Sequence, residues 1–455
     1  MESNRPLGEI CVRVTSEARR FEPGPELSWR PQRGSSAGSI LLNPKRTYQE
    51  VLGFGAALTD ATCSLLHDLA PSSRGQFLRD VFDPASMGLN ACRICIGASD
   101  YATELYSYDE GGPDPELQRF SIDRDRRYIL PVLKHVRELC PDLFILASPW
   151  SPPGWMKVGG SMLGGLIQRK HFATYAEYFL KFLESYAAAG VAVDAVTVQN
   201  EVDTDQDGRM PACYWGQGSE MRFIAEHLGP RFAERNIESR IWILDHNYDL
   251  WGRALSELAD PKVNQYVDGV AWHGYAGQPC SMTSVHKAHP DKHMYWTEGG
   301  PEDLHDPELQ TNWTHWSSRF TEILHNWARC IVVWNLALDE NGGPNIGPFS
   351  CAGLVTLHSQ TKQFTPSGQY WALAHFSRAV RRGARRIQSG GVLKGVSHIA
   401  FLNPDKSYAM VLTNRGRDRT VLVRLLSGVE AEVTLPANSV VTLLWKSSEF
   451  EGGNS

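Results

Sequence analysis

The sequence has no long run of apolar residues and no excess of positive charge. No segment reaches 18 apolar residues, and the start "MESNRPLGEICVRV" lacks the apolar core of a signal peptide, so secretion is not expected. The formal net charge is -6 and the pI is near 6.2, which leaves no basic field to attract nucleic acid or anionic lipid. We therefore expect no nucleic-acid partner and no stable membrane insertion.

The cysteines also lack a pattern. Their number, nine, is odd and their spacing does not repeat, which is typical of reduced thiols in the cytoplasm rather than of a disulfide framework. The chain has no glycine-rich phosphate loop, no HExxH segment and no Ser-His-Asp signature. The sequence therefore predicts a cytoplasmic protein whose chemistry needs no cofactor and no metal.

Short apolar runs alternate with helical segments through the middle of the chain. The segment 171–190, "HFATYAEYFLKFLESYAAAG", has apolar residues at helical spacing and ends at a glycine. Eight runs predict strands: "EVLGFGAALTD", "NACRICIGASD", "LFILASPWS", "VDAVTVQNE", "RIWILDHNYD", "VDGVAWHGY", "HMYWTEGG" and "CIVVWNLALD". Eight strand and helix pairs indicate a (β/α)₈ TIM barrel, an α/β fold whose chemistry lies at the C-terminal ends of the strands.

After about residue 380 the pattern changes to alternating runs such as "SYAMVLTN" and "SVVTLLWK", which predict an antiparallel β-sandwich. The first 45 residues contain similar runs, "EICVRVTS" and "SILLNP", and we expect them to pair with the C-terminal strands. The side domain would then be discontinuous. The predicted organisation is 1–45 for the first sandwich strands, 46–375 for the catalytic barrel and 376–455 for the rest of the sandwich.

Two of the predicted strands end in a glutamate. Glu201 follows "VTVQN" on the fourth run, and Glu298 follows "HMYWT" on the seventh. The ends of different barrel strands converge on one cavity, and paired carboxylates are the groups that cleave a glycosidic bond. A single glutamate is better explained as a turn residue or an ion-pair partner, but two of them in a chain with fourteen tryptophans favour a sugar site. Asn200 is then placed to bind a sugar 2-hydroxyl.

Two other segments resemble metal sites. Asp203, Asp205 and Asp207 in "DTDQDG" copy the start of a calcium loop, but Tyr214 stands at the twelfth position, where that loop needs a glutamate. We expect these acids to shape the loop beside Glu201 instead. The histidines of "HKAHPDKH" (286–293) have no spacing that fixes a shared face, so we expect a solvated loop there.

Several segments together resemble the glucosylceramidase-type members of glycoside hydrolase family 30. These are "GFGAALTDA", "SPWSPPGWMK", "VTVQNE", "AEHLGP", "TEGG" and "WNLALDENGGPN", in this order, and the resemblance continues into the flanking sandwich. It implies a retaining β-glycosidase with Glu201 as general acid/base and Glu298 as nucleophile. The substrate-contacting positions that it implies are Arg93, Asp100, Trp150, Asn200, His273, Tyr275 and Trp334.

The charged and hydrogen-bonding positions have physical roles in this scheme. Arg93 would keep Glu298 ionised, since an opposite charge lowers a carboxylate pKa, or it would only form a buried ion pair between strands. Tyr275 would hydrogen-bond Glu298, and His273 would orient its neighbours. Burial and the nearby Glu298 would keep Glu201 protonated.

The remaining positions would shape the sugar pocket. Trp150 and Trp334 would form its walls, with plain core packing as the structural alternative. Asp100 would accept hydrogen bonds from hydroxyls at the non-reducing end, or would only cap a loop. Val202 stands where family members often have a proline after the acid/base, which bears on the choice of leaving group.

The leading interpretation is a retaining β-glycosidase that hydrolyses β-glucosides or related β-linked sugars through a glycosyl-enzyme intermediate. Its substrate would be a small or oligosaccharide β-glycoside. A β-xylosidase and an endo-β-1,6-glucanase are the alternatives of the same fold. A catalytically silent carbohydrate-binding protein, from another class, would use the same aromatic residues without needing both glutamates. The exact sugar, the aglycone, exo or endo action and the oligomeric state stay open.

Overall fold

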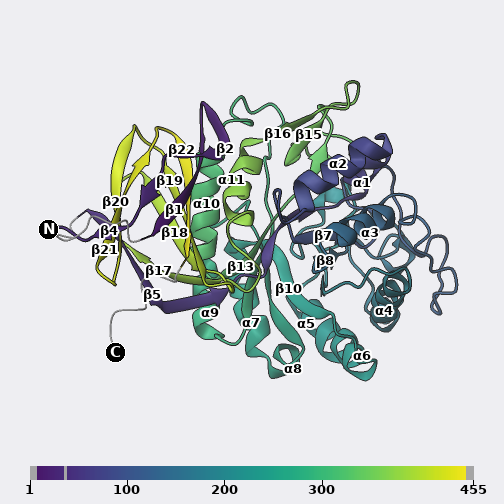
Figure 1. Ribbon diagram of the computed structural model, residues 1–455. Helices are drawn as coiled ribbons and strands as arrows, with labels where there is room; N and C mark the ends of the chain where they lie inside the picture. The colour runs from purple at the N-terminus through teal and green to yellow at the C-terminus, as the bar shows by residue number, and fades with distance from the viewer. Residues whose placement is uncertain (1–7, 35–37, 447–455) are drawn as a thin grey trace. The chain divides into compact units, whose positions relative to one another are not determined.

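The computed structural model describes residues 8–34 and 38–446, which form two compact units that interleave along the chain (Figure 1). One unit takes the described residues of Met1–Phe54, His305–Arg329 and Pro366–Ser455, and the other comprises Gly55–Leu304 and Cys330–Thr365. Among the described helices, none has the length and apolar character that a bilayer crossing requires.

Eight parallel strands close into a barrel, which confirms the fold predicted from the eight apolar runs. In chain order they are β6 (Gly53–Ala57), β7 (Ala91–Cys95), β8 (Phe144–Ser148), β9 (Ala195–Thr197), β10 (Arg240–Asn247), β11 (Val267–His273), β12 (His293–Glu298) and β13 (Ala328–Val333). Every residue of β7, β8 and β9 is buried, because side chains fill the inside of such a barrel and helices cover its outside.

Helices follow the strands of the barrel unit. They are α1 (Asp60–His67), α2 (Pro71–Phe82), α3 (Ile129–Leu139), α4 (Phe172–Ala188), α5 (Gln217–Phe223), α6 (Gly229–Glu234), α7 (Trp251–Ala259), α8 (Pro261–Asn264) and α9 (Cys280–Ala288). The helix predicted in 171–190 is α4, and Gly190 follows it with φ 86°, a left-handed conformation that suits glycine. The solvated loop predicted at 286–293 is wrong in part, because His286 lies on α9 and His293 begins β12.

The register of the strands aligns their polar C-terminal residues. Asn247 at the end of β10 pairs with His273 at the end of β11, and His273 pairs with Glu298 at the end of β12. Strand β10 also contains a bulge: the register shifts between Leu244 and His246, and both Leu244 (φ 71°) and Asp245 (φ 44°) are left-handed. A bulge redirects side chains that would otherwise point to alternate faces, so the end of this strand departs from the simple alternation.

The other unit is a β-sandwich built from both ends of the chain. Its strands are β1 (Glu9–Ser16), β2 (Arg19–Pro23), β3 (Leu27–Ser28), β4 (Arg30–Pro31), β5 (Ser39–Glu50), β17 (Arg385–Gly390), β18 (Val396–Leu402), β19 (Ser407–Asn414), β20 (Arg419–Leu425), β21 (Val429–Leu435) and β22 (Ser439–Lys446). Strand β1 pairs with β22, which confirms that the N-terminal strands join the C-terminal ones. The pairing is antiparallel as predicted, except that β5 and β20 run parallel.

Two helices that follow barrel strands in the chain pack on the sandwich. Helix α10 (Trp313–His325) contacts β18, β19 and β22, and helix α11 (Gly368–Ser377) contacts β2 and β22. This packing places both helices in the sandwich unit. The compact units therefore divide the chain at other points than the predicted domains 1–45, 46–375 and 376–455, which follow chain order.

Candidate active site

Seven of the nine predicted site residues line one cavity of about 380 Å³. They are Asp100, Trp150, Asn200, Glu201, Tyr275, Glu298 and Trp334. The other two, Arg93 and His273, are fully buried and contact the glutamates. The fold thus brings all nine positions into one site within the barrel unit.

Glu298, the last residue of β12, is held by two donors. Arg93 on β7 forms an ion pair through Nη1 with Glu298 Oε2, and the Tyr275 hydroxyl donates to Oε1 at 3.1 Å. Burial raises the pKa of Glu298, and the positive charges of His273 and Arg93 limit the rise. The carboxylate therefore depends on these two cations to stay ionised.

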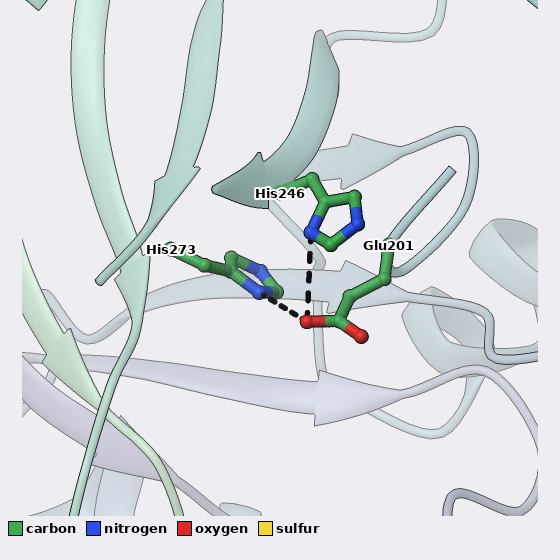
Figure 2. A group of neighbouring side chains, drawn as sticks. All are labelled: Glu201, His246 and His273. Carbon is green, nitrogen blue, oxygen red and sulfur yellow. Dashed lines mark hydrogen bonds and ion pairs between the residues drawn. The ribbon is translucent and has the colours of Figure 1, made fainter. Parts of the chain in front are cut away.

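Glu201 follows β9 in a left-handed backbone conformation, with φ 53°. Its main-chain N–H donates to the carbonyl oxygen of Asp245 at 2.9 Å. Gln206 donates from Nε2 to Glu201 Oε2 at 2.8 Å. The other oxygen, Oε1, lies 3.3 Å from His273 Nδ1 and 3.6 Å from His246 Nδ1 (Figure 2). Both ends of the carboxylate are thus held by neighbouring side chains.

His273 connects the two glutamates. Its Nδ1 lies 3.3 Å from Glu201 Oε1 and 3.8 Å from Glu298 Oε1. Burial opposes the charge of His273, but Glu298 and the hydrogen bonds to Asp245 and Glu201 raise its pKa to about 9. Burial likewise raises the pKa of Glu201, but the hydrogen bond from His273 lowers it overall. The expectation that burial keeps Glu201 protonated is therefore wrong. Of the two side chains, His273 carries the proton and Glu201 is the carboxylate.

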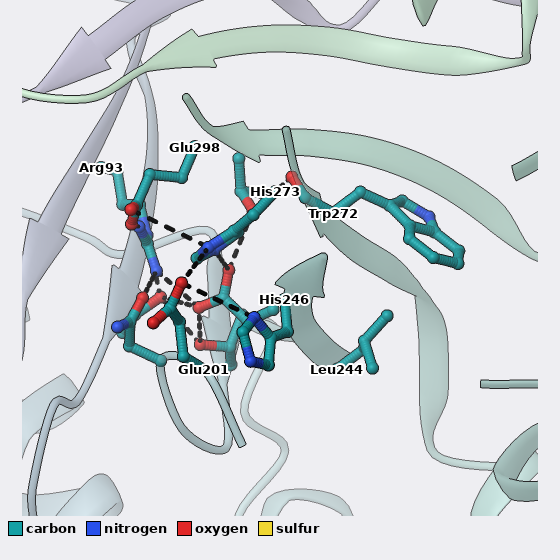
Figure 3. Close-up of polar contacts among 12 residues, drawn as sticks. Arg93, Glu201, Leu244, His246, Trp272, His273 and Glu298 are labelled. Carbon is teal, nitrogen blue, oxygen red and sulfur yellow. Dashed lines mark hydrogen bonds and ion pairs between the residues drawn. The ribbon is translucent and has the colours of Figure 1, made fainter. Parts of the chain in front are cut away.

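Asp245, in the bulge of β10, is a fully buried residue that was not among the predicted positions. Four side chains donate to its carboxylate: Arg93 at 2.6 Å, Ser148 at 2.8 Å, Thr197 at 2.7 Å and Thr297 at 2.9 Å. His273 Nε2 lies 3.0 Å from its Oδ1. Burial opposes ionisation, yet Arg93 and His273 hold the pKa of Asp245 far below its usual range. This carboxylate anchors the two cations that contact the glutamates, and Figure 3 shows Arg93, His273 and both glutamates converging.

Two aromatic rings form a wall of the cavity. Trp150 follows β8 and Trp334 follows β13; their ring centroids lie 5.1 Å apart at an interplanar angle of 21°. The guanidinium carbon of Arg93 lies 4.8 Å from the ring of Trp150 and 5.7 Å from that of Trp334. Flat apolar faces beside carboxylates suit the C–H face of a pyranose, and the cation against the rings holds them in place.

Asp100 lines the same cavity and is almost fully buried. Its Oδ1 has no hydrogen-bond partner in the part of the chain that the structure describes. Burial, with the charges of Glu298 and Glu201, raises the pKa of Asp100 well above its ordinary value. A buried oxygen without a donor costs free energy, so this atom is placed to accept a hydrogen bond from a ligand hydroxyl.

The acidic loop after Glu201 is held by a hydrogen bond within the loop and by an ion pair with α7. Asp205 Oδ1 accepts the N–H of Asp207 at 3.2 Å, and Asp203 Oδ1 lies 3.7 Å from Arg253 Nη1. Gln206, between these acids, is left-handed with φ 52°. This turn brings its amide back to Glu201, so the loop contributes an amide rather than an acid to the site.

The cavity has further lining residues that had no predicted role. They are Thr204, Gln206, Met210, His246, Asn247, Glu302, Phe349 and Cys351. His246 and Asn247 come from the bulged end of β10, where the run "DHN" was the available signal. Over the residues that the structure describes, the one group of side chains with spacing for a metal ion is Glu201, His246 and His273.

Two family models match the chain. The glycosyl hydrolase family 30 TIM-barrel domain matches residues 51–380, and the glycosyl hydrolase family 30 beta sandwich domain matches residues 383–443. The chain belongs to glycoside hydrolase family 30. This confirms the resemblance seen in the sequence, and the protein is a glycoside hydrolase.

Relatives match nearly the whole chain. An endo-1,6-β-D-glucanase of Neurospora crassa is 32% identical over 442 residues, covering 92% of this chain and 89% of the relative. Among solved structures, the endo-β1,6-glucanase BT3312 has a TM-score of 0.88 at 28% identity and covers 97% of this chain and 100% of its own. SrfJ from Salmonella typhimurium has a TM-score of 0.92 at 26% identity, with 96% and 100% covered. These findings support the retaining β-glycosidase function inferred from the sequence.

Proposed function

We propose that this member of family 30 hydrolyses β-1,6-linked glucosides, with Glu298 as nucleophile and Glu201 as general acid/base. The observation that carries the two roles is that His273 Nδ1 lies within 3.8 Å of an oxygen of each glutamate. Two carboxylates that share one ring nitrogen face one cavity. One can then attack the anomeric carbon while the other exchanges a proton with the departing oxygen.

In the first step Glu298 attacks the anomeric carbon, and Glu201 protonates the leaving oxygen. Arg93 and Tyr275 hold one oxygen of Glu298 each, which aims the nucleophile. The proton passes from His273 Nδ1 to Glu201 across 3.3 Å and from there to the leaving group. The glycosidic bond breaks, and a glycosyl ester forms on Glu298.

In the second step the ester is hydrolysed. Esterification removes the charge of Glu298, which is the strongest of the charges that raise the pKa of His273. The pKa of His273 therefore falls. The pair of Glu201 and His273 has by then given up its proton. Glu201 accepts a proton from water, the resulting hydroxide attacks the anomeric carbon, and Glu298 leaves as a carboxylate. Two displacements on opposite faces retain the β-configuration.

The β-1,6 linkage is proposed from the relatives. The Neurospora crassa protein, an Aspergillus fumigatus protein at 31% identity and BT3312 all carry the name of an endo-1,6-β-glucanase. Caenorhabditis elegans relatives, the first of them 29% identical, carry the word glucosylceramidase in their names. The linkage and the aglycone are therefore the features to test.

A linkage panel tests the substrate. We expect kcat/KM for gentio-oligosaccharides to exceed that for β-1,3- and β-1,4-linked gluco-oligosaccharides, xylo-oligosaccharides and detergent-dispersed glucosylceramide by at least about 10-fold, or about 1.4 kcal/mol in transition-state binding. The first product, followed by NMR, should be the β-anomer. A preference for another substrate would overturn the proposed linkage. An α-anomer as the first product would overturn the proposed double displacement.

Variants of the glutamates test the roles. Glu298→Ala should abolish turnover of aryl β-glucosides. Glu201→Ala should spare dinitrophenyl glucoside, whose leaving group needs no proton, and added azide should accelerate it and give a β-glucosyl azide. Glu234→Gln on the exposed end of α6 is the matched control and should keep the unaltered rate. Full activity of both site variants would contradict the assignment.

A further inference from the structure

Glu201, His246 and His273 converge from three different elements. Figure 2 shows both imidazole rings directed at one oxygen of Glu201. That oxygen, Oε1, lies 3.3 Å from His273 Nδ1 and 3.6 Å from His246 Nδ1, and the three ligand atoms all lie within 4.8 Å of one another. Ligand atoms of a tetrahedral zinc site, with bonds of about 2.0–2.1 Å, stand about 3.3–3.4 Å apart. The separation between Glu201 and His273 therefore already matches that of a metal-bound triad, and the separation between Glu201 and His246 is slightly longer.

The contacts behind His273 are those of a metal-ligating histidine. Its Nε2 lies 3.0 Å from Asp245 Oδ1, and Thr297 Oγ1 donates to the same oxygen at 2.9 Å. A histidine that binds a metal through one ring nitrogen usually donates the other N–H to a carboxylate, which fixes the ring and makes the ligating nitrogen more basic. Here that arrangement leaves Nδ1 as the nitrogen that faces Glu201.

His246 has no part in the two displacement steps. Its Nδ1 is buried and makes no hydrogen bond within the described portion of the chain, since Glu201 Oε1 at 3.6 Å is beyond bonding range. The bulge of β10 places this ring, at the cost of left-handed conformations at Leu244 and Asp245. Strained backbone that persists next to a cavity commonly serves a ligand.

The charge around the triad favours a dication. The acidic residues at the cavity and beneath it are Asp100, Glu201, Asp245, Glu298 and Glu302. Arg93 is the permanently charged side chain that opposes them, through ion pairs with Asp245 and Glu298. Glu201 and His246 both line the cavity of about 380 Å³, so an ion can reach the site from the substrate side.

We propose that Glu201, His246 and His273 form a regulatory site for a borderline transition-metal ion of the Zn²⁺ class, which blocks hydrolysis when bound. Two imidazole nitrogens and one carboxylate oxygen select Zn²⁺ and Cu²⁺ over Mg²⁺ and Ca²⁺, which prefer oxygen ligands. The metal takes the place of the proton that His273 shares with Glu201, and that proton leaves to solvent. With Oε1 bound to the metal, Glu201 can neither give nor take a proton. The inhibition rests on the proposed role of Glu201, whereas the binding does not.

The binding is measured without reference to activity. The full chain is titrated with Co²⁺ alone, which replaces Zn²⁺ in such sites and absorbs strongly in the visible range when tetrahedral. We expect saturation at one equivalent, loss of the absorption on addition of Zn²⁺, and no competition by Mg²⁺ or Ca²⁺. Hydrolysis of a β-linked disaccharide, whose leaving group needs a proton from Glu201, should fall in proportion to the fraction of sites filled.

His246→Ala should remove the tetrahedral absorption and weaken Zn²⁺ binding, followed by calorimetry, at least about 10-fold. The matched control is His289→Ala, because His289 lies in the other histidine-rich segment, and it should bind as the unaltered chain does. An experiment without a variant uses an iminosugar that mimics glucose, which should displace Co²⁺ from the cavity. A chain that gives no tetrahedral spectrum, or one whose spectrum survives both the iminosugar and His246→Ala, would overturn the proposal.

Discussion

The main-chain N–H of Glu201 donates to the carbonyl oxygen of Asp245 at 2.9 Å. Both residues are left-handed, Glu201 at φ 53° and Asp245 at φ 44°, a conformation that costs free energy for residues with a side chain. The carboxylate of Asp245 meanwhile contacts Arg93 and His273, which contact Glu298. Asp245 therefore positions Glu201 through its backbone and Glu298 through its side chain.

Replacing Asp245 by asparagine should lower kcat about 100-fold with a much smaller change in KM. The variant keeps the size of the side chain but loses the charge that orients Arg93 and His273, and groups held slightly out of line lose rate more than affinity. Steady-state kinetics with an aryl β-glucoside give kcat and KM separately. Asp268→Asn is the control, because Asp268 lies on β11 and accepts from Trp242 and Tyr295. An equal loss in both variants would show a general structural effect.

Gln206→Ala should slow acid-assisted cleavage selectively. It removes the hydrogen bond of 2.8 Å to Glu201 Oε2, which is worth about 0.5–1.5 kcal/mol. We expect kcat/KM to fall about 2- to 12-fold for a disaccharide, whose leaving group needs a proton. It should change less for dinitrophenyl glucoside. Asp207→Asn, in the same loop but with an exposed side chain, should leave both substrates unaffected; similar losses for both substrates in Gln206→Ala would contradict an orienting role.

Trp334→Phe should weaken substrate binding. The indole stacks on Trp150 in the cavity wall, and a smaller ring offers less area to a sugar face. An aromatic contact contributes about 0.5–1.5 kcal/mol beyond its buried area, so KM should rise roughly 2- to 12-fold. Trp251→Phe, with a side chain 41% exposed on α7, is the matched control. Inhibition constants for an iminosugar give the same comparison without turnover, and unchanged values in Trp334→Phe would exclude stacking by this wall.

The barrel and the glutamates were predictable because their signals are local. The run "HMYWTE" is buried from Met294 to Glu298, and the C-terminal ends of barrel strands are where such a fold gathers its functional side chains. Asp245 and Gln206 were not predictable, because a bulge in β10 and a left-handed turn place them. The pKa of Glu201 depends on its contact with His273, which lies 72 residues away in the sequence. A contact over such a separation cannot be predicted from a local sequence pattern.

The sandwich unit provides a test of stability against pH. His375 on α11 is fully buried, with Nδ1 2.7 Å from Thr442 Oγ1 and Nε2 2.8 Å from Thr15 Oγ1. Burial lowers the pKa of His375 from 6.5 to about 3. Below pH 6.5 His375 in the unfolded chain therefore takes up a proton, whereas His375 in the folded chain stays neutral until about pH 3. The contribution of His375 to the free energy of unfolding is fully present above pH 6.5 and declines as the pH falls across this window. The contribution approaches about 1.4 kcal/mol for each pH unit within it.

His375→Gln cannot titrate, so its free energy of unfolding, measured by urea denaturation from pH 7.5 to 4.5, should decline less steeply than that of the unaltered chain. His67→Gln, at an exposed position, should keep the original slope; equal slopes in all three proteins would mean that His375 takes up its proton at the same pH in the folded and the unfolded chain.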